Sequence, residues 1–133
     1  MSWPEEEARR KAAIAAQAPQ LWRALKAALR RDAEEFHAHN DFGPSVEFPS
    51  SQDENSLWMN VKRGTDLHTG RKLVNVFFDE NRLTVSVNVT RPGQQTVFTI
   101  NAGENGDVHF YRGGVAMSPD QVAESILKPL LSG

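Results

Sequence analysis

The densest group of residues able to do chemistry runs from Glu34 to Asp41, with the sequence Glu-Glu-Phe-His-Ala-His-Asn-Asp. Glu34 and His37 have the three-residue spacing by which carboxylate-bridged metal sites present two ligands from one helical face. Such sites need a second Glu-x-x-His pair, which the sequence lacks. His37 and His39 are two residues apart, so a helix points them in nearly opposite directions. We expect no metal and interpret both histidines as residues that favour a helix carboxyl end, with metal binding and catalysis as the alternatives.

A second group is basic and lies in a glycine-containing segment between two expected strands. Cationic side chains and loop amides can together bind a phosphate or another anion. The G-x-x-x-x-G-K-[ST] spacing of a P-loop is absent from the sequence. The alternative is that the cations keep the strand ends soluble and discourage edge-to-edge pairing. The candidate anion-binding residues are Lys62, Arg63, Arg71 and Lys72.

A third group consists of rings that strand alternation places away from the core. If Leu57 points inward, Trp58 points outward, and the same alternation turns His109 and Tyr111 outward. Phe77 lies in a strand with apolar side chains on both faces. Rings among Asn, Ser and Thr are typical of a recognition surface, so Trp58, Phe77, His109 and Tyr111 are the candidate binding residues. The alternatives are that the first helix or a second subunit covers these rings, or that their exposure is incidental.

The elements that position these groups are strands in the middle of the chain. Residues 83–90 alternate branched or apolar side chains with small polar ones, which predicts a strand with one buried and one solvated face. Pro-Gly at 92–93 and Asn-Gly at 105–106 favour tight turns. We predict a five- to six-stranded antiparallel meander with strands near 46–48, 56–62, 72–79, 82–90, 95–102 and 107–112.

Helices are predicted on both sides of this meander. Ser2 and Glu5 have capping-box spacing, and the helical pattern that follows ends near His39 or Asn40. Pro19 removes a backbone donor, so this N-terminal helix is kinked or broken there. The part before Pro19 has little to bury and should project or pack loosely. The later part carries an apolar stripe made of Leu21, Leu25, Leu29, Ala33 and Phe36.

A C-terminal helix is predicted from the segment that starts at Ser118. Ser118 and Gln121 have capping-box spacing, and Pro119 suits the first helical position. The helix carries a broad apolar face, so we expect it to pack on the sheet. Residues 1–133 should therefore form a single α+β domain.

Composition limits the classes of protein to consider. The chain is 39% hydrophobic and 24% charged, as an ordinary folded protein is. A net charge of −2 argues against nucleic-acid binding, and the absence of cysteine excludes thiol nucleophiles, thiolate zinc sites and disulfides. No apolar run has the length of a membrane span, so we expect no membrane partner and a cytoplasmic location. Arginine outnumbers lysine two to one, which is typical of a GC-rich bacterial genome.

Two classes of function remain open. The first is a small non-enzymatic interaction or ligand-binding domain that uses the open sheet face, with an unknown protein or small molecule as partner and no cofactor. A homodimer through an edge strand at 107–112 belongs to this class. The second is a small α+β enzyme whose acid–base residues, among them His37, His68 and His109, assemble only in the fold. A closed pocket with histidine against a carboxylate would favour the enzyme, and a shallow aromatic face the binding domain.

Overall fold

The computed structural model describes residues 2–39, 44–49, 53–62, 71–90, 93–103 and 105–132. Helix α1 (Trp3–His39) precedes the strands and helix α2 (Pro119–Ser132) follows them. The strands are β1 (Ser45–Glu47), β2 (Ser56–Lys62), β3 (Arg71–Asp79), β4 (Thr84–Val89), β5 (Gln94–Ala102), β6 (Val108–Arg112) and β7 (Val115–Met117). Neither α1 nor α2 combines the length and apolar character needed to cross a lipid bilayer in the part of the chain described.

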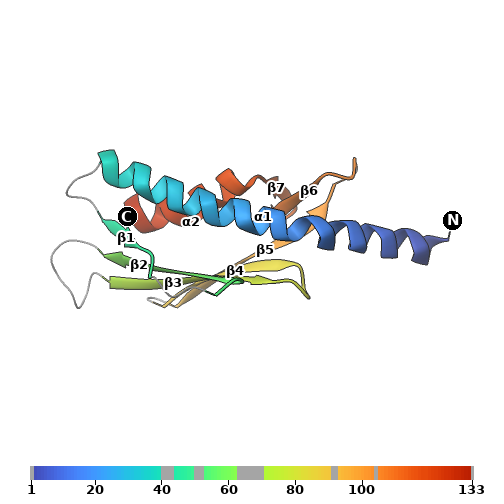
Figure 1. Ribbon diagram of the computed structural model, residues 1–133, viewed down its shortest axis with the longest axis horizontal. Coiled ribbons are helices and arrows are strands. Elements are labelled where there is room, and N and C mark those ends of the chain that lie inside the picture. The colour runs from blue at the N-terminus through green and yellow to red at the C-terminus, as the bar shows by residue number, and fades with distance from the viewer. Residues whose placement is uncertain are drawn as a thin grey trace.

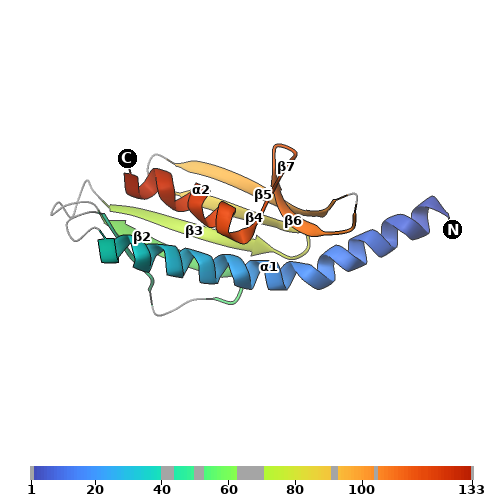
Figure 2. The ribbon, with the colours of Figure 1, turned by 90° about the horizontal axis from the view of Figure 1, so that it is seen from above.

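The seven strands form one sheet in the order in which they follow along the chain, and every neighbouring pair is antiparallel. The predicted meander and α+β class are therefore confirmed. Both helices lie against the same side of the sheet (Figures 1 and 2), where they also pack on each other. Neither helix lies over the opposite side of the sheet, although Arg10 of α1 reaches Asn101 near the end of β5.

The core lies between the sheet and the two helices. Side chains of successive strand residues alternate between the two faces, so every second residue points toward the helices. Full burial of each large apolar side chain contributes about 1.5–3 kcal/mol. The strand residues buried on this side are Val46, Leu57, Met59, Val61, Val74, Val76, Phe78, Val85, Val87, Phe98, Ile100, Val108 and Phe110.

Helix α1 continues through Pro19 without a break, and its axis bends along its length (Figure 2). After the proline, the helix is attached to the sheet by Trp22, whose Nε1 donates to the Glu54 carbonyl oxygen over 2.8 Å. The Trp22 ring stacks on Phe78 with 5.8 Å between ring centroids. The amino-terminal end of the helix extends beyond the sheet (Figure 1), and Trp3 is 75% exposed. Ile14 and Ala18, which also precede the proline, are buried in the core. Helix α1 therefore covers the sheet with one part and projects with the other.

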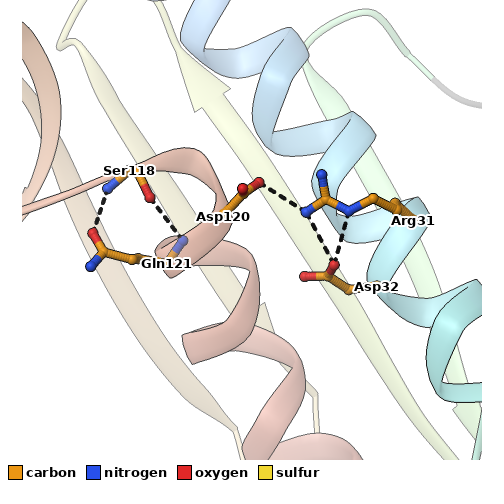
Figure 3. A network of polar contacts seen from close by, with 5 residues as sticks. All are labelled: Arg31, Asp32, Ser118, Asp120 and Gln121. Carbon is orange, nitrogen blue, oxygen red and sulfur yellow. Dashed lines mark hydrogen bonds and ion pairs between the residues drawn. The ribbon is translucent and has the colours of Figure 1, made fainter.

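Helix α2 begins with the predicted capping box (Figure 3). Ser118 Oγ accepts from the Gln121 amide over 3.2 Å, and Gln121 Oε1 accepts from the Ser118 amide over 2.8 Å. Beside the cap, Arg31 of α1 pairs with Asp120 at 2.9 Å and with Asp32 at 3.1 Å. The hydrogen bond to Asp120, followed by that to Asp32, raises the pKa of Arg31 above its ordinary value. The start of α2 is thus held against α1.

Strand β7 was not predicted. Gly113 and Gly114 have φ angles of 59° and 80°, which suit the two central positions of a type I′ hairpin turn. The turn pairs β7 with β6, in the register Tyr111 opposite Ala116. The expectation that residues 107–112 form a sheet edge is therefore wrong, because β7 occupies that edge.

Strand β4 begins two residues later than predicted. Asp79 Oδ1 accepts from the amides of Asn81 and Arg82 over 3.0 and 3.1 Å, which holds these residues in a turn. Leu83 completes the turn with φ of 54°, a conformation that costs a branched residue of the order of 1–2 kcal/mol. Leu83 nevertheless packs against the core. Its apolar character made it resemble a strand residue.

Candidate binding face

The side of the sheet opposite the helices is the candidate functional surface, which we call the outer face. Its residues alternate with the core residues along β2 to β6. The charged members with described side chains, Lys62 and Asp79, lie at strand ends, and the other described members are uncharged. They are Ser56, Trp58, Asn60, Leu73, Asn75, Phe77, Thr84, Ser86, Asn88, Gln95, Val97, Thr99, Asn101, His109 and Tyr111.

Apolar groups on the outer face gather over β2 to β5. The strand register places Phe77 opposite Ser86 and Ser86 opposite Val97. Phe77 is 40% exposed and Val97 is 47% exposed. Trp58 is half-buried and lies opposite Asn75, one diagonal step from Phe77. Trp58, Phe77 and Val97 are called the apolar patch below.

Val97 was not among the predicted binding residues. It stands next to Phe98, so the two apolar neighbours hide the alternation that is clear in β4. The spacing of Phe98 and Ile100 could have identified it. These residues are two apart and both buried, so Val97, which has the opposite parity in the strand, points outward.

The rings on β6 are separated from Trp58 and Phe77, although Tyr111 lies one diagonal step from Val97. His109 lies opposite Asn101 and Tyr111 opposite Thr99, and both rings are half-buried. Strands β4 and β5 lie between β6 and β3, a separation of about 14 Å at the usual strand spacing. A Cβ atom added at Gly103 would lie 3.2 Å from the Tyr111 hydroxyl, so this hydroxyl lies beside the β5–β6 turn. The four predicted residues therefore share one face but form two groups.

Asn75 is a polar residue at the centre of the strands that carry the apolar patch. It lies between Trp58 on β2 and Asn88 on β4. Its Nδ2 is shielded from solvent and has no hydrogen-bond acceptor among the residues that the structure describes. A buried donor without a partner costs about 1–3 kcal/mol. Asn75 therefore lowers the free energy of unfolding of the isolated chain.

The predicted basic residues do not gather at one place in the described ranges. Lys62 pairs with Glu47 of β1, with 3.0 Å between Nζ and Oε2. Lys72 lies opposite Val61, a buried residue, so Lys72 and Lys62 belong to opposite faces of the sheet. Arg63 and the side chain of Arg71 lie outside the described residues.

His37 has a structural role. Its Nε2 accepts a hydrogen bond from the Val46 amide over 2.9 Å, which connects β1 to the end of α1. Glu34 and His39 are exposed, and within the described ranges no three His, Asp or Glu side chains are placed to hold a metal ion. His68, the remaining candidate base, lies outside the described residues.

Four cavities lined by described residues lie away from the centre of the outer face. One separates α1 from α2, one lies between α2 and strands β4 to β6, and two adjoin α1 near sheet ends. Their volumes lie between about 90 and 360 Å³. Carboxylates line some of these cavities, but none of the four is lined by a histidine. The histidine–carboxylate pocket expected of the enzyme alternative is therefore not among them.

No protein-family model, no curated protein and no solved structure matches this chain. The geometry of the described residues is therefore the basis for the functional argument.

Proposed function

We propose that this protein is a non-enzymatic binding domain whose outer face holds a protein partner. The observation that carries the proposal is a sheet face opposite the helices whose charged residues with described side chains, Lys62 and Asp79, stand at strand ends, so that its centre is uncharged. Surfaces of soluble proteins usually contain about 25–35% charged residues. The centres of protein interfaces, by contrast, are depleted of charge and enriched in aromatic side chains.

The apolar patch supplies the anchors of the proposed interface. Large rings that become fully desolvated on binding contribute more to affinity than the contacts around them. Phe77 and Val97 are 40% and 47% exposed, so they still have apolar surface to lose on binding. The surrounding amides and hydroxyls can pair with polar groups of the partner, which fixes its orientation.

The outer face has about half the area that one partner contributes to a specific interface. The five strands β2 to β6, spaced about 4.8 Å apart, span about 19 Å, and six residues of strand extend about 20 Å. The product is about 400 Å², compared with roughly 800 Å² on each partner in a standard interface. A partner that also touches the rim, including β1 and β7, would reach the standard size.

Photo-crosslinking at Phe77 tests the proposal. A benzoylphenylalanine in place of Phe77 keeps a ring at this position and captures whatever lies against it in the native host cells. We expect a discrete adduct. Adding Val97→Glu should remove the adduct while leaving the melting temperature within a few degrees, because Val97 is 47% exposed.

Val115 provides the matched control. It is 62% exposed but lies on β7, outside the apolar patch. The same photo-reactive residue at Val115 should give no discrete adduct. Equal adducts from both positions, no adduct from Phe77, or an adduct that survives Val97→Glu would each contradict the proposal.

A further inference from the structure

The projecting part of α1 has little support within its own chain. Residues 3–13 are exposed except for Glu7, which is half-buried. Within the described ranges this part is held by Arg10, which donates to Asn101 Oδ1 over 2.7 Å and to the Ala102 carbonyl oxygen over 3.4 Å and pairs with Glu7 at 3.6 Å. Isolated helices shorter than about 12–15 residues are marginal in water. An exposed Trp3 at the far end of such a segment points to a contact outside the single chain.

An apolar groove lies at the other end of α1. It has a volume of about 250 Å³ and separates the carboxyl-terminal parts of α1 and α2. Its apolar lining is formed by Phe36, Leu127 and Leu131, and its polar lining by Asp32, Glu124 and Lys128. A cavity of about 150 Å³ is large enough for benzene. The groove therefore has room for an indole ring, which is one fused ring larger.

The length of α1 relates the groove to Trp3. The helix has 37 residues, so it is about 55 Å long. Trp3 is the first residue of the helix, and Phe36 lies three residues, about 4.5 Å, before its last. When two copies of α1 lie antiparallel across a two-fold axis at the middle of the helix, Trp3 of each copy comes beside the groove of the other. A two-fold axis forms both contacts at once.

We propose that the protein forms an antiparallel homodimer in which Trp3 of each copy occupies the groove between α1 and α2 of the other copy. The apolar body of the indole lies against Phe36 and Leu127, and its N–H donates to a carboxylate of the groove, as buried tryptophans require. Glu5 and Glu6, which follow Trp3, come close to the Lys128 cation of the other copy. This contact uses the helix side of the molecule and does not depend on the proposed role of the outer face.

Cysteine crosslinking tests the geometry, because the chain contains no cysteine of its own. The variant Ser2→Cys with Lys128→Cys places one thiol beside Trp3 and one at the groove. Mild oxidation should give a covalent dimer on a denaturing gel. The control variant Ser2→Cys with Arg82→Cys, whose second thiol lies on the β3–β4 turn, should not. Adding Trp3→Ala to the first pair should abolish the covalent dimer.

Sedimentation velocity tests the assembly without a crosslink. The full chain of 14.8 kDa should sediment as a dimer, and Trp3→Ala should weaken the dimer by about a hundredfold or more, since two anchors are lost per dimer. The melting temperature of monomeric Trp3→Ala should match that of the unmodified chain at a concentration where both are monomers, because Trp3 is 75% exposed.

Three outcomes would overturn the inference. The first is a full chain that remains monomeric up to millimolar concentration. The second is a dimer that persists unchanged in Trp3→Ala, and the third is equal crosslinking in the control variant. A dimer that Val97→Glu disrupts and Trp3→Ala does not would place the second copy on the outer face and contradict the antiparallel dimer.

Discussion

Along β5, Phe98 and Ile100 are almost completely buried, whereas Val97 beside them is 47% exposed. The same contrast recurs in β4, where Val85 and Val87 face the helices and Ser86 lies between them on the outer face. The side chains on one face of the sheet are thus buried against the helices, whereas those on the other face keep solvent-exposed surface. Because the two faces share their backbone, mutations on neighbouring residues can separate stability from binding.

The largest expected effect is on the layer that covers the inner face. Deleting residues 118–133 removes six buried side chains, namely Val122, Ala123, Ile126, Leu127, Leu130 and Leu131. Since burial of each Leu or Ile contributes about 1.5–3 kcal/mol and a domain of this kind has about 5–15 kcal/mol in total, the truncated chain should be unfolded or aggregated. Circular dichroism against temperature measures this. A cooperative melt close to that of the full chain would show that α2 is dispensable.

The next effect compares the two faces within one strand. Phe98→Ala should lower the free energy of unfolding by about 3–5 kcal/mol, because Phe98 is 1% exposed and leaves a cavity. Val97→Ala, one residue earlier, should cost no more than about 0.5 kcal/mol. Urea titrations of both variants give the two values. Similar losses in both variants would mean that the outer face is covered in the folded protein.

A smaller effect tests the attachment of α1 to the sheet. Trp22→Phe keeps a ring against Phe78 but removes the hydrogen bond to the Glu54 carbonyl, so stability should fall by about 1 kcal/mol. Trp3→Phe serves as the control, because Trp3 is 75% exposed and should tolerate the change. Urea titration below the concentration at which the chain dimerises gives both values. A Trp22→Phe variant with an unchanged free energy of unfolding would show that packing alone holds the helix on the sheet.

The smallest effect has the opposite sign. Asn75→Val removes the shielded Nδ2 donor and should raise the free energy of unfolding by about 0.5–1 kcal/mol. The same substitution should reduce the adduct formed at position 77, because Asn75 lies beside the apolar patch. Thermal melting and the crosslinking yield are the two measurements. A variant that is less stable than the unmodified chain would show that the amide has a partner in solution.

The sequence predicted the sheet well because its alternation and turn signals are local. The period of two in residues 83–90 gave the facing of β4, and Ser118 with Gln121 marked the start of α2 correctly. Strand β7 was missed since three residues are too few to show a period, although Gly113 and Gly114 are a turn signal. Parity also placed Trp58, Phe77, His109 and Tyr111 on the outer face.

Features that depend on distant residues were not predictable. Trp22 contacts a carbonyl 32 positions away, and His37 accepts from an amide in a different element. Neither contact leaves a pattern in its own segment. The division of the outer-face rings into two groups depends on the strand register, which no single strand reveals. Local patterns therefore predicted which face a residue occupies, and the register determined which residues are neighbours.

The order of the sheet has a consequence for synthesis on the ribosome. Each strand pairs with the one made just before it, so hairpins can form as the chain emerges, with short loops to close. Helix α2 follows all seven strands, however, and with α1 it covers the apolar side. Until α2 emerges, the nascent sheet exposes valine, phenylalanine and isoleucine to solvent, the condition that makes partly made chains prone to aggregate. We therefore expect nascent chains that stop short of α2 to depend on chaperones, and those that include it to be released from them.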